Sequence, residues 1–296
     1  MSRVLLRFEN RKGITLKGMR FDPDEVPARP RFVIYLPGIV LGCAAVHRLG
    51  MKIAEHLAAL GFRTLLFDHS GIGESEGSFQ GGSHENLTDW VMRGALVDDT
   101  LDAISFVQRE YQATEIYLVG HCGGSLTSAY AASQSDLIRG AFLIAPPTLG
   151  TGGRAQRHVD ATEANLVLYR RKVFSWDAWK RLLSMESNLS EIGQALLSPI
   201  WKPKGPGGPV HDTFNMDLIR ALRAMTERKA ALRVFFGDHD PDLKHFLEFT
   251  KSTLAPPLAF TIQEDTRHGF LTPDSLGALL KAVGDFVSAT PFEGWD

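Results

Sequence analysis

The pentapeptide Gly120-His121-Cys122-Gly123-Gly124 constrains the fold of this chain more than any other segment. The apolar residues 116–119 before it predict a short buried strand, and the small residues 125–132 after it predict a tightly packed helix. With glycines two residues before and two residues after it, Cys122 is expected on a sharp, strained turn between the two. Such a turn lifts a side chain clear of the backbone. The pattern favours a nucleophilic thiol over an inert, buried one.

Apolar runs alternate with helical spacing along most of the chain. The runs predict an N-terminal hairpin at 4–8 and 14–21, and further strands at 32–36, 62–67, 116–119, 138–144, 232–237 and 258–263. Helical spacing is found at 44–60, 87–111, from 242 onward and at 273–289. Continuous apolar strands that alternate with helices predict a parallel sheet buried on both faces.

Residues 148–215 interrupt this alternation. They contain no convincing strand, and their last part, 199–209, is rich in proline and glycine. We expect a helical cap inserted into a core domain formed by residues 1–147 and 216–296. Trp176, Trp179 and Leu183 are candidates for lining an apolar substrate pocket in the cap, although packing onto the core is the commoner use of such residues.

Length and charge narrow the class of protein. The 296 residues suffice for one large domain with an insertion, and a net charge near −2 gives no reason to expect nucleic-acid binding. No apolar run reaches the ~18 residues of a membrane span, so stable membrane insertion is not expected. The two cysteines, Cys43 and Cys122, form no disulfide framework, which favours a reducing, cytoplasmic setting. The oligomeric state stays open.

Three candidate chemical groups follow three predicted strands in the order nucleophile, acid, histidine. Cys122 follows one strand, an acid in Gly237-Asp238-His239-Asp240-Pro241 follows another, and His268 follows the last. Because the carboxyl ends of parallel strands gather at one edge of a sheet, we expect these groups to meet. An imidazole and a helix N-terminus lower the pKa of a thiol from ~8.5, and a carboxylate holds the imidazole in one tautomer. The pattern favours a Cys–His–Asp set, with Asp238 or Asp240 as the acid.

These motifs resemble those of the α/β-hydrolase superfamily over nearly the whole chain outside residues 148–215. The resemblance is carried by Leu36-Pro37-Gly38, by Phe67-Asp68-His69-Ser70-Gly71-Ile72-Gly73-Glu74-Ser75-Glu76-Gly77, by the pentapeptide, by Gly237-x-x-Asp240 and by His268-Gly269-Phe270. Pro37 stands where the superfamily usually has histidine, and His69 where it usually has arginine. A cysteine at the turn is similar to dienelactone hydrolases and to acyl-CoA thioesterases and acyltransferases. Trp179-Lys180-Arg181-Leu182-Leu183 is similar to a segment of exosortase-associated hydrolases.

The resemblance implies an α/β-hydrolase fold, with a mostly parallel eight-stranded sheet flanked by helices and a helical cap. It makes Cys122 the nucleophile and His268 the general base and then acid. Because Gly-x-x-Asp is the superfamily's spacing, it makes Asp240 the orienting carboxylate, with the aspartate two residues earlier as the alternative. The main-chain N–H groups of Ile39 and Gly123 would form the oxyanion hole.

The expected function is that of an acyl hydrolase of esterase, thioesterase or lactonase type. It would act on a small-molecule acyl substrate through a covalent acyl-enzyme. The alternatives are an acyltransferase that uses the same intermediate and a catalytically silent fold used for binding. No cofactor is expected, because no cluster has metal-ligand spacing and no Gly-x-Gly-x-x-Gly opens a helix.

Three further features carry expectations. Asp68, Gly71, Gly73 and Ser75 predict a tight turn that supports the site. Cys43 is expected to be a small buried hydrophobe, with a resolving thiol for Cys122 as the alternative. His121, although next to Cys122 in sequence, is expected to point away from the site.

Overall fold

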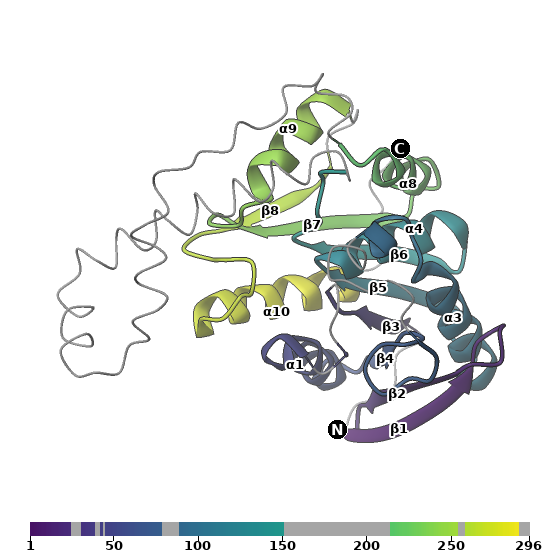
Figure 1. The fold of residues 1–296 in the computed structure, drawn as a ribbon. Coiled ribbons are helices and arrows are strands. Elements are labelled where there is room, and N and C mark those ends of the chain that lie inside the picture. Colours follow the sequence, from purple (N-terminus) through teal and green to yellow (C-terminus); the bar gives the residue numbers. More distant parts are fainter. Residues whose placement is uncertain are drawn as a thin grey trace, which may run out of the picture. The chain divides into compact units, whose positions relative to one another are not determined.

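A computed structural model describes residues 1–24, 31–38, 42–43, 45–78, 89–150, 214–253 and 258–289. Its centre is an eight-stranded sheet in the order β1-β2-β4-β3-β5-β6-β7-β8 (Figure 1). The strands are β1 (Ser2–Glu9), β2 (Thr15–Asp22), β3 (Arg31–Leu36), β4 (Arg63–Asp68), β5 (Glu115–His121), β6 (Ile138–Ile144), β7 (Ala231–Gly237) and β8 (Phe260–Gln263). The hairpin β1–β2 and the pair β2–β4 are antiparallel, and the other neighbouring strands are parallel. The predicted hairpin and parallel sheet are confirmed.

Helices cover both faces of the sheet. They are α1 (Ala45–Ala59), α3 (Val97–Tyr111), α4 (Gly123–Gln134), α8 (Met216–Glu227), α9 (Leu243–Thr253) and α10 (Pro273–Ser288). α1 packs against β4 and α10, whereas α4 packs against β5, β6, α3 and α8 (Figure 1). Within the described ranges, no helix is long and apolar enough to cross a membrane.

The stretch 87–111, predicted to be mostly helical, is interrupted once in the structure. Residues 89–92 are helical, a turn covers residues 93–96, and α3 begins at Val97. Gly94 lies in that turn with φ of 81°, a left-handed conformation that interrupts a helix and that glycine adopts readily.

The chain divides into two units, Met1–Thr148 with Asn215–Asp296, and Leu149–Phe214. Nearly all of the predicted cap, including Trp176, Trp179 and Leu183, falls outside the described residues. The helical cap and its pocket therefore stay predictions.

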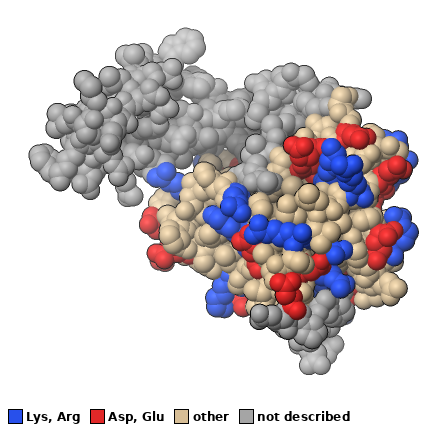
Figure 2. Space-filling model, turned by 90° about the horizontal axis from the view of Figure 1, so that it is seen from below, with Lys and Arg blue, Asp and Glu red and all other residues tan. Residues whose placement is uncertain are grey.

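The centre of the sheet is apolar on both faces, and its N-terminal edge is exposed. All six residues of β3 are buried, as expected for a strand with helices on either side. At the edge, Leu5 of β1 is 79% exposed. In the view of Figure 2, positive and negative side chains are interspersed. Oppositely charged side chains of the described residues form ion pairs, as Arg3 does with Glu55 at 2.6 Å.

The connection from β5 to α4 depends on two glycines. A Cβ added to Gly124 would overlap the main-chain oxygens of Leu36 and Pro37, and one added to Gly120 would overlap that of Gly124. The first turn of α4 therefore lies directly against the ends of β3 and β5. This close approach fixes where Cys122 projects from the sheet.

We expect Gly124→Ala to destabilise the protein by about 2–4 kcal/mol, because its Cβ meets backbone that cannot rotate away. Gly277→Ala on α10 is the matched control. A Cβ there meets nothing within 4 Å, and the change should stabilise by up to about 1 kcal/mol. Urea unfolding of both variants gives the comparison. Equal stabilities would show that α4 does not need this approach to β3.

Candidate active site

Cys122 lies on a strained turn between β5 and α4. Its φ of 53° and ψ of −117° are sparsely populated by residues other than glycine. The surroundings hold it there: its N–H donates to the carbonyl oxygen of Ile144 at 2.8 Å. The hydroxyl oxygen of Ser125 lies 2.7 Å from the carbonyl oxygen of Gly120 and 2.8 Å from that of Ile144. Ser125, which the sequence did not single out, thus ties the turn to β5 and β6.

His268 and Asp240 meet at the carboxyl ends of β8 and β7. The Nδ1–H of His268 donates to Asp240 Oδ2 at 2.7 Å, and the main-chain N–H of Asp242 donates to Asp240 Oδ1 at 2.9 Å. The side chain of Asp240 is fully buried, and that of His268 is 33% exposed. Both carboxylate oxygens are therefore fixed, and the imidazole has Nε2 left for another partner.

Asp238, the alternative acid, contacts Thr266 and His239 instead of His268. Its Oδ1 accepts the N–H of Thr266 at 2.9 Å and lies 2.9 Å from Nδ1 of His239. These contacts tie the segment after β8 to the end of β7. Of the two aspartates, the structure brings Asp240 to His268.

The thiol of Cys122 completes a contiguous set with these two side chains. Burial by itself would lower the pKa of His268. The negative charge of Cys122, hydrogen bonds to Asp240 and Cys122, and the charge of Asp240 together raise that pKa well above its ordinary value. Because one pair of charges stabilises both partners, the arrangement favours a thiolate beside an imidazolium.

Gly123 and the loop after β3 border the same thiol. Gly123 is the first residue of α4, and the first N–H groups of a helix have no partner within it. A Cβ added to Gly38 would lie 3.5 Å from Cβ of Cys122, so the loop begins next to the thiol. Ile39 falls outside the described residues, and its place in an oxyanion hole stays a prediction.

Asp68 organises the tight turn predicted after β4. Its carboxylate accepts the N–H of Glu74 at 2.9 Å and also that of Cys43. Gly71 and Gly73 have φ of 73° and 57°. The predicted turn is confirmed, and it also holds the end of the loop that follows β3.

The thiol of Cys43 differs from that of Cys122. Burial, followed by the negative charge of Asp68, raises the pKa of Cys43 to about 12. Both cysteines, each among the described residues, are reduced. Cys43 is therefore an inert thiol in this state, and its coupling to Cys122 stays untested.

The expectation for His121 is wrong. Side chains alternate along a strand, so His121 lies on the same face as Tyr117, whose ring contacts Phe286 of α10. His268 lies on the segment between β8 and α10, and this segment brings it next to His121 at the end of β5. The ring of His121 lies 5.0 Å from that of His268, and its Nε2 lies 3.0 Å from the carbonyl oxygen of His268.

Asp242 is a further residue that the sequence did not single out. Ligand-type atoms of Asp240, Asp242 and His268 lie within 4.8 Å of one another, although sequence spacing predicts no such cluster. Oxygen and imidazole donors suit a divalent cation. A cation bound at Nδ1 of His268 would, however, replace its bond to Asp240. We therefore interpret the group as a hydrogen-bonded carboxylate–imidazole pair.

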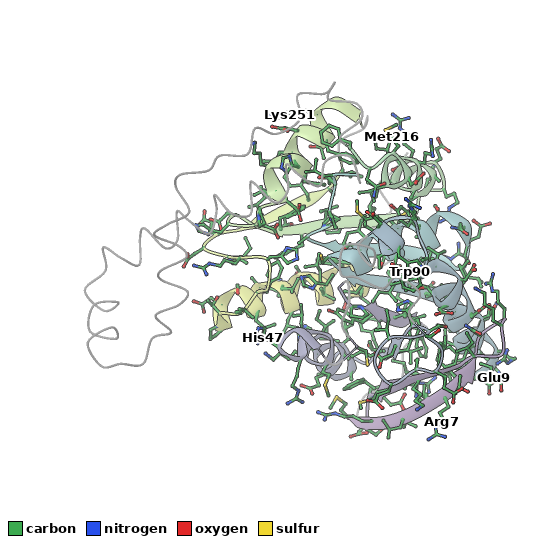
Figure 3. The ribbon with its side chains drawn as sticks, viewed as in Figure 1. Arg7, Glu9, His47, Trp90, Met216 and Lys251 are labelled. Carbon is green, nitrogen blue, oxygen red and sulfur yellow. The ribbon has the colours of Figure 1, made fainter. Side chains whose placement is uncertain are left out.

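A hollow of about 200 Å³ lies beside the loop that follows His268. It is bordered by the start of α1, where Figure 3 labels His47, and by the start of α10. Its walls are His47, Leu49, Lys52, Gly269, Phe270, Leu271 and Leu276. A small apolar group with a polar end would fit such walls.

Known structures share this fold. The chain is similar to XC6422 of Xanthomonas campestris, described as an α/β serine hydrolase without lid, with TM-score 0.57, 19% identity and 98% of each chain covered. It is also similar to the Pyrococcus furiosus esterase Pf2001, with TM-score 0.61, 16% identity and coverage of 98% of this chain and 92% of that one. The α/β hydrolase GrgF of Penicillium sp. sh18 has TM-score 0.61 and 19% identity, with 97% of this chain and 98% of that chain covered.

Sequence comparison agrees with the structural likeness. A comparison with curated proteins gives no match. The model of the alpha/beta hydrolase fold family matches residues 32–183, a range that includes β3, the turn after β4 and the Cys122 turn. The chain therefore belongs to the α/β-hydrolase fold family.

Proposed function

We propose that this protein is an acyl hydrolase that cleaves ester or thioester bonds with Cys122 as its nucleophile. The observation that carries the proposal is the contiguous set formed by Cys122 on its strained turn with His268 and Asp240, at the carboxyl edge of the sheet. The family supports hydrolysis, and relatives of the same fold are described as serine hydrolases and esterases. The departure from those relatives is the sulfur nucleophile.

The first half of the reaction forms an acyl-enzyme. The thiolate of Cys122 attacks the carbonyl carbon, and the electron pair of the C=O bond moves to oxygen. The N–H of Gly123, with that of Ile39 as the second donor, stabilises this oxyanion, and one such donor contributes about 3 kcal/mol in the transition state. Collapse of the intermediate expels the alcohol or thiol, which takes the proton from Nε2 of His268.

The second half returns the enzyme to its starting state. His268 takes a proton from water through Nε2 while the water oxygen attacks the thioester carbon. The tetrahedral intermediate collapses, the C–S bond breaks and the carboxylic acid leaves. Cys122 is then again a thiolate beside the protonated His268. Throughout, Asp240 keeps Nδ1 protonated, so that Nε2 faces the reacting atoms. Amide bonds require stronger protonation of the leaving group, so esters and thioesters are the preferred substrates.

Alkylation tests the thiolate without knowledge of the substrate. We expect iodoacetamide to modify Cys122 at least about tenfold faster than Cys43 at pH 6–7, because the imidazolium keeps Cys122 ionised below the ordinary pKa of ~8.5. Cys43, with its pKa raised to about 12, is an internal control. The rate for Cys122 should fall only when acid protonates its thiolate. Peptide mass spectrometry measures both sites, and His268→Ala should remove the advantage. Equal, slow modification of both cysteines would contradict the mechanism.

The two neighbouring aspartates provide a matched pair of variants. Asp240→Asn should lower kcat by about 10²–10⁴-fold, because the amide favours the wrong imidazole tautomer. Asp238→Asn should change kcat by less than about threefold, because its remaining oxygen still accepts the N–H of Thr266. Hydrolysis of an activated phenyl ester or thioester gives the rates. The reverse order of effects would make Asp238 the acid.

A further inference from the structure

His121, the residue before Cys122, contacts His268. It is the last residue of β5 and is 2% exposed. Its Nε2 lies 3.0 Å from the main-chain oxygen of His268, and the two rings are 5.0 Å apart and inclined at 41°. A carbonyl only accepts, so Nε2 of His121 carries the hydrogen and donates it. The bond thus fixes the tautomer of His121 as well as the carbonyl of His268.

The other nitrogen of the His121 ring, Nδ1, indicates that the bond from Nε2 to His268 has a role. With the proton on Nε2, Nδ1 is a bare acceptor, and it is buried with no hydrogen-bond partner among the described residues. Burying an unsatisfied acceptor costs stability, whereas an apolar side chain of similar size would fill the same space without that cost. What the histidine provides, and an apolar side chain would not, is the hydrogen bond to the carbonyl oxygen of His268.

The segment around His268 needs such support. Asp265 and Phe270, on either side of it, have φ of 47° and 51°, which are strained values for residues with a Cβ. Asp240 holds the imidazole of His268 through its side chain, and His121 holds the same residue through its main chain. Two anchors on one residue restrict both the path of the loop and the direction of Nε2.

The charge of His121 suits this position. Burial, followed by the positive charge of His268, lowers the pKa of His121 to about 4. His121 is therefore neutral at neutral pH. A neutral ring packs against the imidazolium of His268 without opposing its charge, whereas a lysine or arginine there would repel it.

We propose that His121 is a positioning residue for the catalytic pair: its Nε2–H fixes the main-chain carbonyl of His268, and its ring supports the imidazole that faces Cys122. This inference rests on the proposed function, since it concerns the partner of the thiolate. It assigns no contact between His121 and substrate.

The test uses three variants of the full chain. His121→Leu removes the donor, and His121→Gln keeps an N–H at a similar reach. The matched control is His69→Leu, because His69 is equally buried at 2% and its Nε2 lies 3.1 Å from Thr100 Oγ1 of α3, a bond that does not involve His268. For each variant, the rate of Cys122 alkylation by iodoacetamide is measured from pH 5 to 9, together with urea unfolding.

We expect His121→Leu to slow alkylation of Cys122 near neutral pH by about threefold to tenfold, the ratio for one ordinary hydrogen bond, and to move the profile toward higher pH. His121→Gln should restore most of the rate. His69→Leu should lower stability while leaving the profile unchanged. A folded His121→Leu protein with the native profile would overturn the proposal, as would an equal shift in His69→Leu.

Failure of the proposed function gives a different result. If His268→Ala leaves the Cys122 profile unchanged, the thiolate–imidazolium pair itself is wrong. If His268→Ala removes the advantage but the His121 variants do not alter it, only the positioning role is overturned. Should His121→Leu not fold, His121→Met decides, because it also removes the donor while its flexible side chain fills a similar space. A shifted profile in folded His121→Met then supports positioning, and a native profile contradicts it.

Discussion

The close approach of α4 to the ends of β3 and β5 is the constraint on which the rest of the site depends. It exists because Gly120 and Gly124 carry no side chain where main-chain atoms meet. The same approach forces Cys122 to a φ of 53° and directs its thiol away from the sheet. Bonds from Ser125 and from the N–H of Cys122 hold this strain in place. A more flexible turn would let the thiol relax away from His268.

Once the thiol is fixed, the chemistry depends on how the imidazole is held. Asp240 is itself fixed by the N–H of Asp242, so His268 receives a carboxylate that cannot rotate. The pair Cys122–His268 then differs from a serine–histidine pair in one physical respect. A thiol is acidic enough to ionise beside an imidazole, so in the proposed mechanism the nucleophile is charged before substrate binds. At Cys43, burial and then the negative charge of Asp68 raise the pKa, so this thiol stays protonated.

Sequence reasoning succeeded where a local pattern has one physical solution. Apolar runs gave the strands within a few residues, and glycine spacing placed Cys122 on its turn. The residue pattern alone left Asp238 and Asp240 open, because both follow β7, and the superfamily spacing favoured Asp240. Only the path of the segment after β8 brings Asp240 to His268. The prediction for His121 was wrong because His268, far from it in sequence, reaches the end of β5 only through the tertiary fold. The alternation of side chains along the strand, which puts His121 on the same face of the sheet as Tyr117, could have predicted the face on which His121 lies. Ser125 and Asp242 act through main-chain geometry, which residue type alone does not reveal.

The central claim is that sulfur, and not another nucleophile, carries the acyl group. Its most direct test is the mass of the peptide containing Cys122 after the protein is mixed with an activated ester and quenched in acid. The account predicts an acyl adduct on Cys122 that neutral hydroxylamine removes, because a thioester is cleaved by it. Ester hydrolysis with Cys122 unmodified, or an adduct on another side chain, would contradict it.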